Sequence, residues 1–334
     1  MMRLLGIDIG GANIKAAVRT SHKIDQARSW SFPLWKDPAG LPEKLREVFE
    51  QLGPVDVIGA TMTGELCDCF ASKAEGVRAI LDALESVKDG ANLRWWSTDG
   101  RYVGSETAKE NYLSIAAANW SAGAHWLGRK YGDGLVLWID IGSTTTDLIP
   151  ILDGKPIPAG ITDPHRIQSG ELIYTGVRRT PLCALMGLAG ATELFATTDD
   201  LFGVLGDIPE YSSDCDTADG KPRSQTARIL RMARMLGADL ETSTQDEIVA
   251  LARSLRKVMV DRIASSIETI RTRLGRDINR FLVSGSGEFF ARQIHQEIRG
   301  DSCPRVDLSR LLGKGASTAL PAVALAMLLE VQGC

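Results

Sequence analysis

Two short segments of the chain have a pattern that suits phosphate and magnesium chemistry. Each contains the sequence Ile-Asp-Ile-Gly, with the aspartate at Asp8 in the first copy and at Asp140 in the second. A glycine turn after a strand leaves backbone N–H groups free and lets a phosphate approach without meeting a Cβ atom. An aspartate at the end of such a strand can hold a hydrated Mg²⁺ ion. We therefore expect Asp8 and Asp140 to be magnesium ligands beside a phosphate site.

The repetition of this pattern is a stronger signal than either copy. A single short glycine motif is weak evidence, and one copy alone would be read as a hairpin with a surface aspartate. Two matching copies, with a third glycine turn after a strand at residues 284–287, favour two related half-structures whose turns converge. The residues predicted to contact phosphate or nucleotide are Gly10, Gly11, Ala12, Asn13, Gly142, Ser143, Thr144, Thr145, Thr146, Gly285, Ser286, Gly287 and Glu288.

Four side chains near these turns are candidates for catalysis: Asp8, Lys15, Glu65 and Asp147. Lys15 would add a positive charge beside the phosphate. Glu65 and Asp147 each follow a glycine turn that we expect to line a cleft, so either could accept a proton as a general base. For Glu65, a carboxylate at a helix N-terminus that complements the helix dipole is an equally economical interpretation.

Other residues are weaker candidates. Arg178 and Arg179 would suit a carboxylate or a phosphate, although a solvated turn is the more economical interpretation. Cys67 and Cys69 are interpreted as buried or half-buried thiols, because no second cysteine pair or histidine cluster completes a metal site. The four histidines lie far apart and have no metal-ligand spacing.

The elements that must position these residues follow from the pattern of apolar residues. Both Ile-Asp-Ile-Gly segments are predicted to be strand–turn–strand hairpins, at residues 4–18 and 135–152. The other predicted strands are residues 55–60, 94–96 and 281–283. The predicted helices are residues 41–52, 76–87, one capped by Ser105, 115–131, a long helix from the capping box of Thr244 and Glu247 to Leu274, and a last apolar helix.

This alternation of strands and helices predicts an α/β protein with two lobes, as expected for 334 residues. The first lobe is predicted to span residues 1–134, completed by a C-terminal helix at 315–334. The second is predicted to span residues 135–314 and to carry the second hairpin and the third glycine turn. Residues 209–224 are polar and are predicted to form an exposed loop.

Composition excludes several functional classes. Lys and Arg number 38 against 42 Asp and Glu, for a formal charge of −4, so we expect neither nucleic acid nor an anionic membrane as partner. The six cysteines are scattered, and no segment resembles a signal peptide or a membrane span. A reduced, cytoplasmic protein is expected.

The order of these elements resembles the actin, Hsp70 and sugar-kinase superfamily. Residues 7–15 and 139–148 are similar to its two phosphate elements, residues 283–288 lie where it has an adenosine element, and residues 315–326 where it has a connecting helix. The resemblance implies a two-lobed actin-like ATPase fold of ribonuclease H type, with mixed sheets flanked by helices and a ligand cleft between the lobes. It also leaves open whether ATP binds.

The sequence of the second hairpin resembles one branch of this superfamily in particular. Residues 140–147 are similar to the hydantoinase A and oxoprolinase signature D-[IV]-G-G-T-[ST]-T-D, from which Ser143 departs by replacing the second glycine. The sequences TMTGEL at 61–66, TDGR at 98–101 and AAANW at 116–120 resemble a compact group linked to tetrahydromethanopterin-dependent one-carbon metabolism. Archaeal members of that group join a furanmethyl diphosphate to the phenol of γ-glutamyltyramine during methanofuran biosynthesis, and release diphosphate.

The resemblance therefore implies a transferase that uses Mg²⁺ and forms an aryl ether from small-molecule diphosphate and phenol substrates. An ATP-dependent small-molecule kinase, a hydantoinase- or oxoprolinase-like enzyme, and a nucleotide-gated regulatory protein are the alternatives. The sequence does not fix the exact acceptor, and it leaves a homodimer open.

Overall fold

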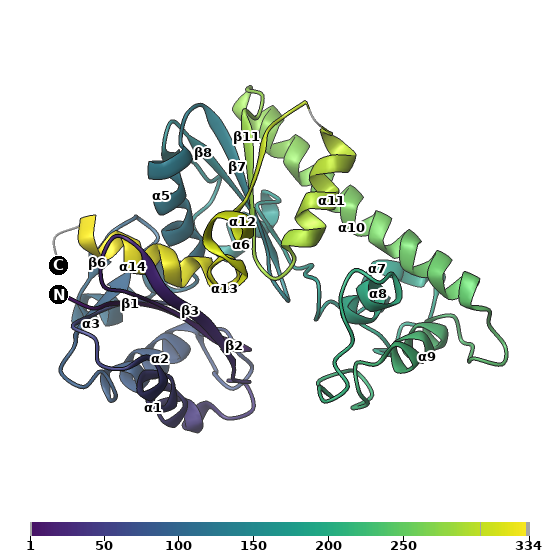
Figure 1. Cartoon of the computed structure of the whole chain (residues 1–334), viewed down its shortest axis with the longest axis horizontal. Coiled ribbons are helices and arrows are strands. Elements are labelled where there is room, and N and C mark those ends of the chain that lie inside the picture. Colours follow the sequence, from purple (N-terminus) through teal and green to yellow (C-terminus); the bar gives the residue numbers. More distant parts are fainter. Residues whose placement is uncertain (1, 301, 332–334) are drawn as a thin grey trace.

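Two mixed β-sheets with flanking helices form the framework of the molecule (Figure 1). The computed structural model describes residues 2–300 and 302–331. The first sheet has the order β3-β2-β1-β4-β5-β6 and the second β10-β8-β7-β11-β12, with β9 paired to β8. The strands are β1 Leu4–Gly10, β2 Asn13–Arg19, β3 Ile24–Ser31, β4 Val57–Thr63, β5 Asn92–Trp96, β6 Tyr102–Val103, β7 Leu135–Ile141, β8 Thr146–Leu152, β9 Lys155–Pro156, β10 Leu172–Ile173, β11 Arg280–Ser284 and β12 Arg305–Asp307.

The two sheets are built on the same plan. In each, an antiparallel hairpin (β1–β2 or β7–β8) is followed, on the other side of its first strand, by two parallel strands (β4 and β5, or β11 and β12). The first strand of each hairpin lies inside its sheet and is apolar almost throughout. This arrangement confirms the predicted α/β class and the internal repeat.

Helices cover both sheets. They are α1 Leu41–Leu52, α2 Lys73–Glu85, α3 Ser105–Glu110, α4 Tyr112–Ile115, α5 Asn119–Tyr131, α6 Asp163–Gln168, α7 Cys183–Met186, α8 Thr198–Val204, α9 Gln225–Met235, α10 Gln245–Leu274, α11 Glu288–Ile298, α12 Leu308–Leu312, α13 Lys314–Thr318 and α14 Leu320–Val331, with short 3₁₀ turns at Pro38–Gly40 and Gly187–Ala189. Within the described residues, no helix is both long and apolar enough to cross a membrane.

Helices α5 and α14 form a layer that both lobes share. Helix α14 approaches β1 so closely that a Cβ atom on Gly6 would lie 1.9 Å from the Ala322 carbonyl oxygen. On the other side, a Cβ atom on Gly123 of α5 would lie 2.1 Å from the Trp138 ring of β7. The chain therefore returns to the first sheet at its C-terminal end. The predicted helix at 315–334 is two helices, α13 and α14, and residues 332–334 lie outside the described part.

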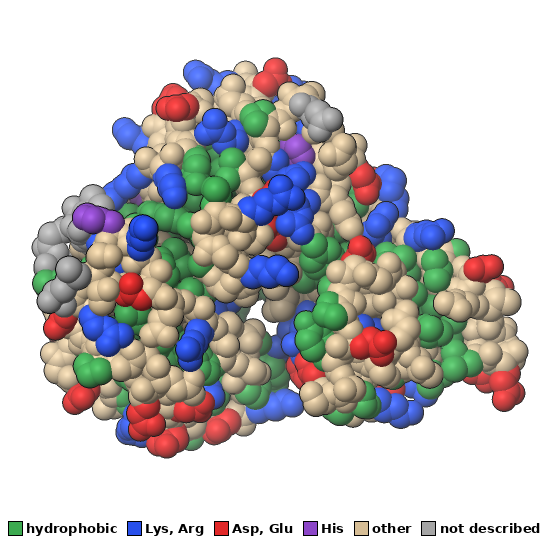
Figure 2. Space-filling view, viewed as in Figure 1, with side chains coloured by type: hydrophobic (Ala, Val, Ile, Leu, Met, Phe, Trp, Pro, Cys, Tyr) green, Lys and Arg blue, Asp and Glu red, His purple; other side chains and the backbone are tan. Residues whose placement is uncertain are grey.

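A helical extension of the second lobe contains α7, α8, α9 and the first part of α10 (Figure 1, right). Buried ion pairs hold it together: Arg228 Nη2 lies 3.0 Å from Asp199, and Arg231 Nη2 lies 2.7 Å from Asp200. The predicted loop at 209–224 lies here and is irregular, with one isolated β-bridge. Figure 2 shows an opening between this extension and the first lobe.

Two local predictions and one alternative interpretation were wrong. Ser105 is the first residue of α3, and Gly104 is its N-cap. The helix predicted from residue 115 begins at Asn119, because Ala117 has a left-handed φ of 49° that interrupts it. Strand β4 runs to Thr63 and α2 begins only at Lys73, so Glu65 does not lie at a helix N-terminus.

Candidate active site

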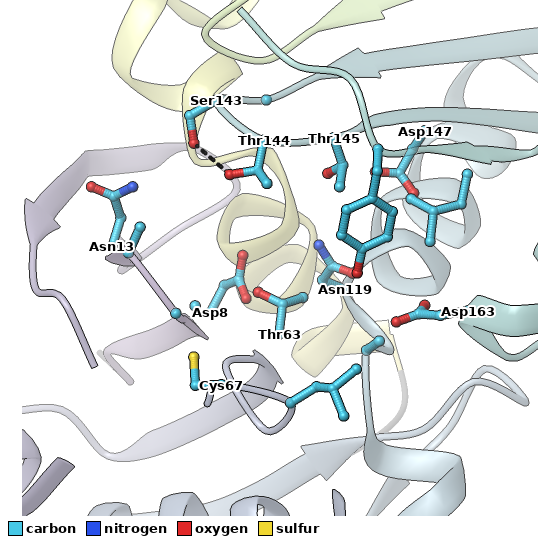
Figure 3. Close-up of a pocket in the computed structure, with 18 of the residues that line it drawn as sticks. Asp8, Asn13, Thr63, Cys67, Asn119, Ser143, Thr144, Thr145, Asp147 and Asp163 are labelled. Carbon is cyan, nitrogen blue, oxygen red and sulfur yellow. Dashed lines mark hydrogen bonds between the residues drawn. The ribbon is translucent and has the colours of Figure 1, made fainter. Parts of the chain in front are cut away.

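The turns of the two hairpins face a common cavity of about 370 Å³ (Figure 3). Its walls come from β1–β2, the turn after β4, the start of α5, β7–β8 and α6. The predicted site residues that line it are Asp8, Gly10, Gly11, Ala12, Asn13, Lys15, Glu65, Asp140, Gly142, Ser143, Thr144, Thr145 and Asp147. The structure thus brings both phosphate turns and all four catalytic candidates to one place.

Other predicted site residues lie outside the lining. The hydroxyl of Thr146 is buried and donates a 2.7 Å hydrogen bond to the Thr175 carbonyl oxygen. The third turn packs beneath the second hairpin, because a Cβ atom on Gly285 would lie 2.2 Å from the Ile141 carbonyl oxygen. This turn therefore supports the hairpin in the structure, and its role toward adenosine stays a prediction.

The remaining residues of the third turn also make contacts within the protein and do not line the cavity. The buried carboxylate of Glu288 accepts hydrogen bonds from the hydroxyl groups of Ser309 and Ser317, which ties α11 to the helices near the C-terminus. Ser286 and Gly287 are also absent from the residues that line the cavity. A Cβ atom on Gly287 would lie 2.5 Å from the Ile141 side chain. The packing explains the glycines here without a ligand.

Strand register decides which side chains meet at the cavity. In the first hairpin Asp8 lies opposite Lys15, and in the second Asp140 lies opposite Asp147. Directly opposed residues of an antiparallel pair point to the same face, so each aspartate shares its surroundings with its partner. The first lobe thus presents a carboxylate with an amine, and the second presents two carboxylates.

The two repeated aspartates are the residues best placed to hold a metal. Burial raises the pKa of both Asp8 and Asp140 to about 6, although the positive charge of Lys15 acts in the opposite direction. Asp140 accepts a hydrogen bond from Ser284, whereas Asp8 Oδ1 is buried without a partner. No group of three or more metal-ligating side chains occurs among the described residues. Two carboxylates nevertheless suit Mg²⁺, which keeps several waters and takes phosphate oxygens as further ligands.

Glu65 lines the same cavity. Its residue is only 1% exposed, and its Oε2 has no hydrogen-bond partner. The cation paired with it is Lys73, whose Nζ lies 3.9 Å from Oε1. Burial raises the pKa of Glu65 to about 7, and the negative charges of Asp163 and Asp8 raise it further against the effect of Lys73. This carboxylate is therefore available for a ligand or a proton.

Arg166 is a cavity residue that the sequence did not reveal. Its guanidinium is buried, donates a 2.9 Å hydrogen bond to Asp147 Oδ1, and stacks 4.5 Å from the Trp120 ring centre. It lies one turn after Asp163 on α6, so the two side chains share a helix face. This spacing is the signal that would have indicated both residues.

A cation–π contact joins the two lobes at the edge of the cavity. The Arg179 guanidinium lies 4.3 Å from the centre of the Trp35 ring, and both residues line the cavity. The Arg179 backbone N–H donates to the Ser143 carbonyl oxygen, which fixes this arginine beside the second hairpin. Arg178 differs, because it pairs with Asp214 and Asp216. Only Arg179 is thus directed toward the site, and neither arginine lies in a merely solvated turn.

The fold and the site define a two-lobed α/β protein with an actin-like ATPase fold and a cavity between its two hairpins. Among solved structures, nucleotide-free acetone carboxylase superposes with a TM-score of 0.58 at 11% identity over 97% of this chain and 70% of that one. The PilM–PilN type IV pilus biogenesis complex superposes with a TM-score of 0.53 at 13% identity over 97% of this chain and 98% of that one.

The chain belongs to the hydantoinase/oxoprolinase family, whose model matches residues 56–330. A curated relative from Methanocaldococcus jannaschii is 33% identical over 98% of both chains. That relative is named (4-{4-[2-(gamma-L-glutamylamino)ethyl]phenoxymethyl}furan-2-yl)methanamine synthase.

Proposed function

We propose that this protein is a magnesium-dependent cytoplasmic transferase that joins a furanmethyl diphosphate to the phenol of a glutamyl-tyramine acceptor, as a step in the synthesis of a methanofuran-type one-carbon carrier. The observation that carries the proposal is the sequence identity of 33%, over 98% of this chain, with a relative that is named for an aryl ether product of this kind. The cavity supports the proposal because its turns and charges suit a diphosphate leaving group.

The reaction exchanges one carbon–oxygen bond for another. The bond between the furan methylene and diphosphate breaks, and its electron pair leaves with the diphosphate. The phenol oxygen forms the new bond to the methylene carbon, and the phenol loses its proton. An electron-rich furan stabilises positive charge on that carbon, so the developing negative charge on the leaving group is what the protein must stabilise.

Several groups of the chain are placed for this task. The backbone N–H groups of the turns at residues 10–13 and 142–145 would donate to the diphosphate oxygens, and Lys15 would add a positive charge beside them. Asp8 and Asp140 would hold Mg²⁺, which supplies charge neutralisation to the departing diphosphate when it is bound. For the phenol proton, Asp147 and Glu65 are the two candidate acceptors, and only Asp147 already accepts a hydrogen bond from an arginine.

The ATP-dependent alternatives are not favoured. Both curated relatives, which are 33% and 31% identical to this chain over the matched residues, are named for the ether-forming synthase.

The decisive experiment mixes the purified protein and Mg²⁺ with a furanmethyl diphosphate, with and without γ-glutamyltyramine. Diphosphate release that requires the phenol, together with the ether mass in the product, would support the proposal. ATP turnover without any diphosphate substrate would indicate a kinase or a hydrolase instead. An ATP-dependent change of assembly without turnover would indicate a regulatory protein.

A further inference from the structure

Carboxylates line the side of the cavity that lies opposite the turn of the first hairpin. Figure 3 shows Asp147 and Asp163 on the side of the cavity opposite Asn13. Glu65 also lines the cavity, and the charge of Asp163 raises its pKa. Arg166 is hydrogen-bonded to Asp147, and its charge also acts on Asp163. The charge of Lys73 acts on both Glu65 and Asp163. Three carboxylates thus face two cations here. This side of the cavity therefore suits a ligand that carries positive charge.

Glu65 shows most directly that a partner is missing. It is almost fully buried, its Oε2 accepts no hydrogen bond, and the Nζ of Lys73 is 3.9 Å from the other oxygen, at the limit of an ion pair. A buried carboxylate oxygen without a partner is costly, and a charged hydrogen bond to it is among the stronger interactions in proteins. A donor that enters from the cavity would remove this cost. Such a group must offer N–H donors and positive charge.

The product named for the curated relative carries an aminomethyl group, and thus a primary amine, on the furan ring. A primary amine is protonated at neutral pH and offers three N–H donors, like a lysine ammonium. We infer that Glu65 and Asp163 form a subsite for the ammonium group of the furan substrate. This inference rests on the proposed function and assigns the aminomethyl group of that substrate to the acidic side of the cavity.

The charge pattern then fixes the orientation of the substrate. The ammonium lies against Glu65 and Asp163, and the diphosphate lies against the glycine turns and Lys15. The furan ring joins the two, with its reacting methylene nearer the hairpins. In this arrangement Glu65 binds substrate and does not take the phenol proton, which leaves Asp147 as the candidate base.

The test compares two diphosphate donors, one with the aminomethyl group and one with an ethyl group in its place. The normal protein is expected to prefer the amine by about 10–100-fold in kcat/KM, the factor that a charged hydrogen bond supplies. Glu65→Gln is expected to reduce this preference to a few-fold, mainly by raising KM for the amine. Asp163→Asn is expected to reduce it less. Asp68→Asn removes the same charge from an exposed position three residues from Glu65 and is expected to keep the preference.

Two outcomes would overturn the inference. One is that the normal protein does not distinguish the donors. The other is that Glu65→Gln lowers kcat by the same factor with both, which would identify Glu65 as the general base. If neither donor reacts, the proposed function fails, and the subsite is tested separately with furan-2-ylmethanamine as a probe. That amine is then expected to raise the melting temperature of the normal protein and of Asp68→Asn, but not of Glu65→Gln. An equal rise in all three would reject the subsite.

Discussion

Lys15 and Asp147 occupy the same position in the two halves of the molecule, each directly across a hairpin from the repeated aspartate. One half therefore places an amine where the other places a carboxylate. Lys15 lowers the pKa of Asp140 as well as that of Asp8, so its charge acts on both lobes. Asp147 has the opposite effect on both aspartates, and Arg166 pairs with it. The two halves therefore share the same backbone arrangement, but the charges of the side chains at equivalent positions differ.

Replacement of Lys15 tests this asymmetry. Lys15→Gln is expected to lower kcat by about 100-fold, because a positive charge beside the leaving group is lost. It is also expected to shift the acid limb of the pH–rate profile upward, since Lys15 holds down the pKa of Asp8 and Asp140. Both quantities follow from steady-state kinetics between pH 5 and 9. Lys23→Gln, at an exposed turn, is the control. A normal pH profile in Lys15→Gln would exclude this role.

Replacement of the repeated aspartates tests the metal. Asp8→Asn and Asp140→Asn are each expected to lower turnover at least about 100-fold if these side chains hold Mg²⁺. Calorimetric titration with Mg²⁺ in the presence of diphosphate is expected to show weakened binding in both variants. Ser284→Ala keeps the carboxylate of Asp140 and removes the hydrogen bond to it, together with the bond that Trp138 Nε1 donates to Ser284, so a smaller loss of turnover is expected. Full activity of both asparagine variants would remove the metal from the mechanism.

Much of the framework could be predicted because it depends on local sequence. The two hairpins were identified from the repeated Ile-Asp-Ile-Gly, and the helix from Gln245 to Leu274 from its capping box and apolar periodicity. Strand β3 was missed because its sequence, IDQARSWS, is largely polar and exposed, as suits a strand at a sheet edge. Helices α8 and α9 were missed because buried arginines pair with aspartates there, so the apolar pattern is broken.

The sequence predicted only those parts of the site that a local motif forms, in which a strand, its turn and their side chains are close in the chain. The turns at residues 10–13 and 142–145 met because they belong to equivalent strands. The third turn has the same kind of sequence, but its glycines are explained by close packing against Ile141. The pairing of Arg166 with Asp147 and the stacking of Arg179 on Trp35 depend on how distant segments meet. No local pattern records such contacts.

The raised pKa of Glu65 predicts a pH-dependent stability. Its pKa rises from 4.5 to about 7 on folding, so the folded chain holds this proton more tightly than the unfolded chain. The resulting stabilisation is complete below pH 4.5 and is lost as the pH rises through about 7, by about 3 kcal/mol. The Glu65→Gln variant has no carboxyl group here, so it does not lose this stabilisation as the pH rises. Urea unfolding at pH 5 and pH 8 is expected to show a smaller decrease for Glu65→Gln than for the normal protein. Equal decreases in the two proteins would show that Glu65 is not the source of the pH dependence.

The cation–π contact of Arg179 predicts a difference between two neighbouring arginines. Among the described residues, no carboxylate forms an ion pair with Arg179, whereas Arg178 pairs with two. Arg179→Gln is therefore expected to weaken binding of inorganic diphosphate about tenfold, as the loss of one charged hydrogen bond would. Arg178→Gln is expected to change the binding of diphosphate less than threefold, because the Arg178 guanidinium is already paired with two carboxylates. Isothermal titration with Mg²⁺ present measures both. A larger effect at Arg178 would place the anion elsewhere.

The buried ion pairs of the helical extension predict a strong effect on folding. Arg231→Met leaves the carboxylate of Asp200 buried without its guanidinium partner. Removal of one member of a buried pair usually costs about 3–5 kcal/mol, because an uncompensated charge remains. Arg234→Met is the matched control on the same helix, since Arg234 is partly exposed and lies 3.4 Å from Asp219. Its expected cost is below about 1 kcal/mol. Urea unfolding at pH 7 measures both free energies. Equal costs would show that Asp200 finds another partner or a proton, and that the extension does not depend on this pair.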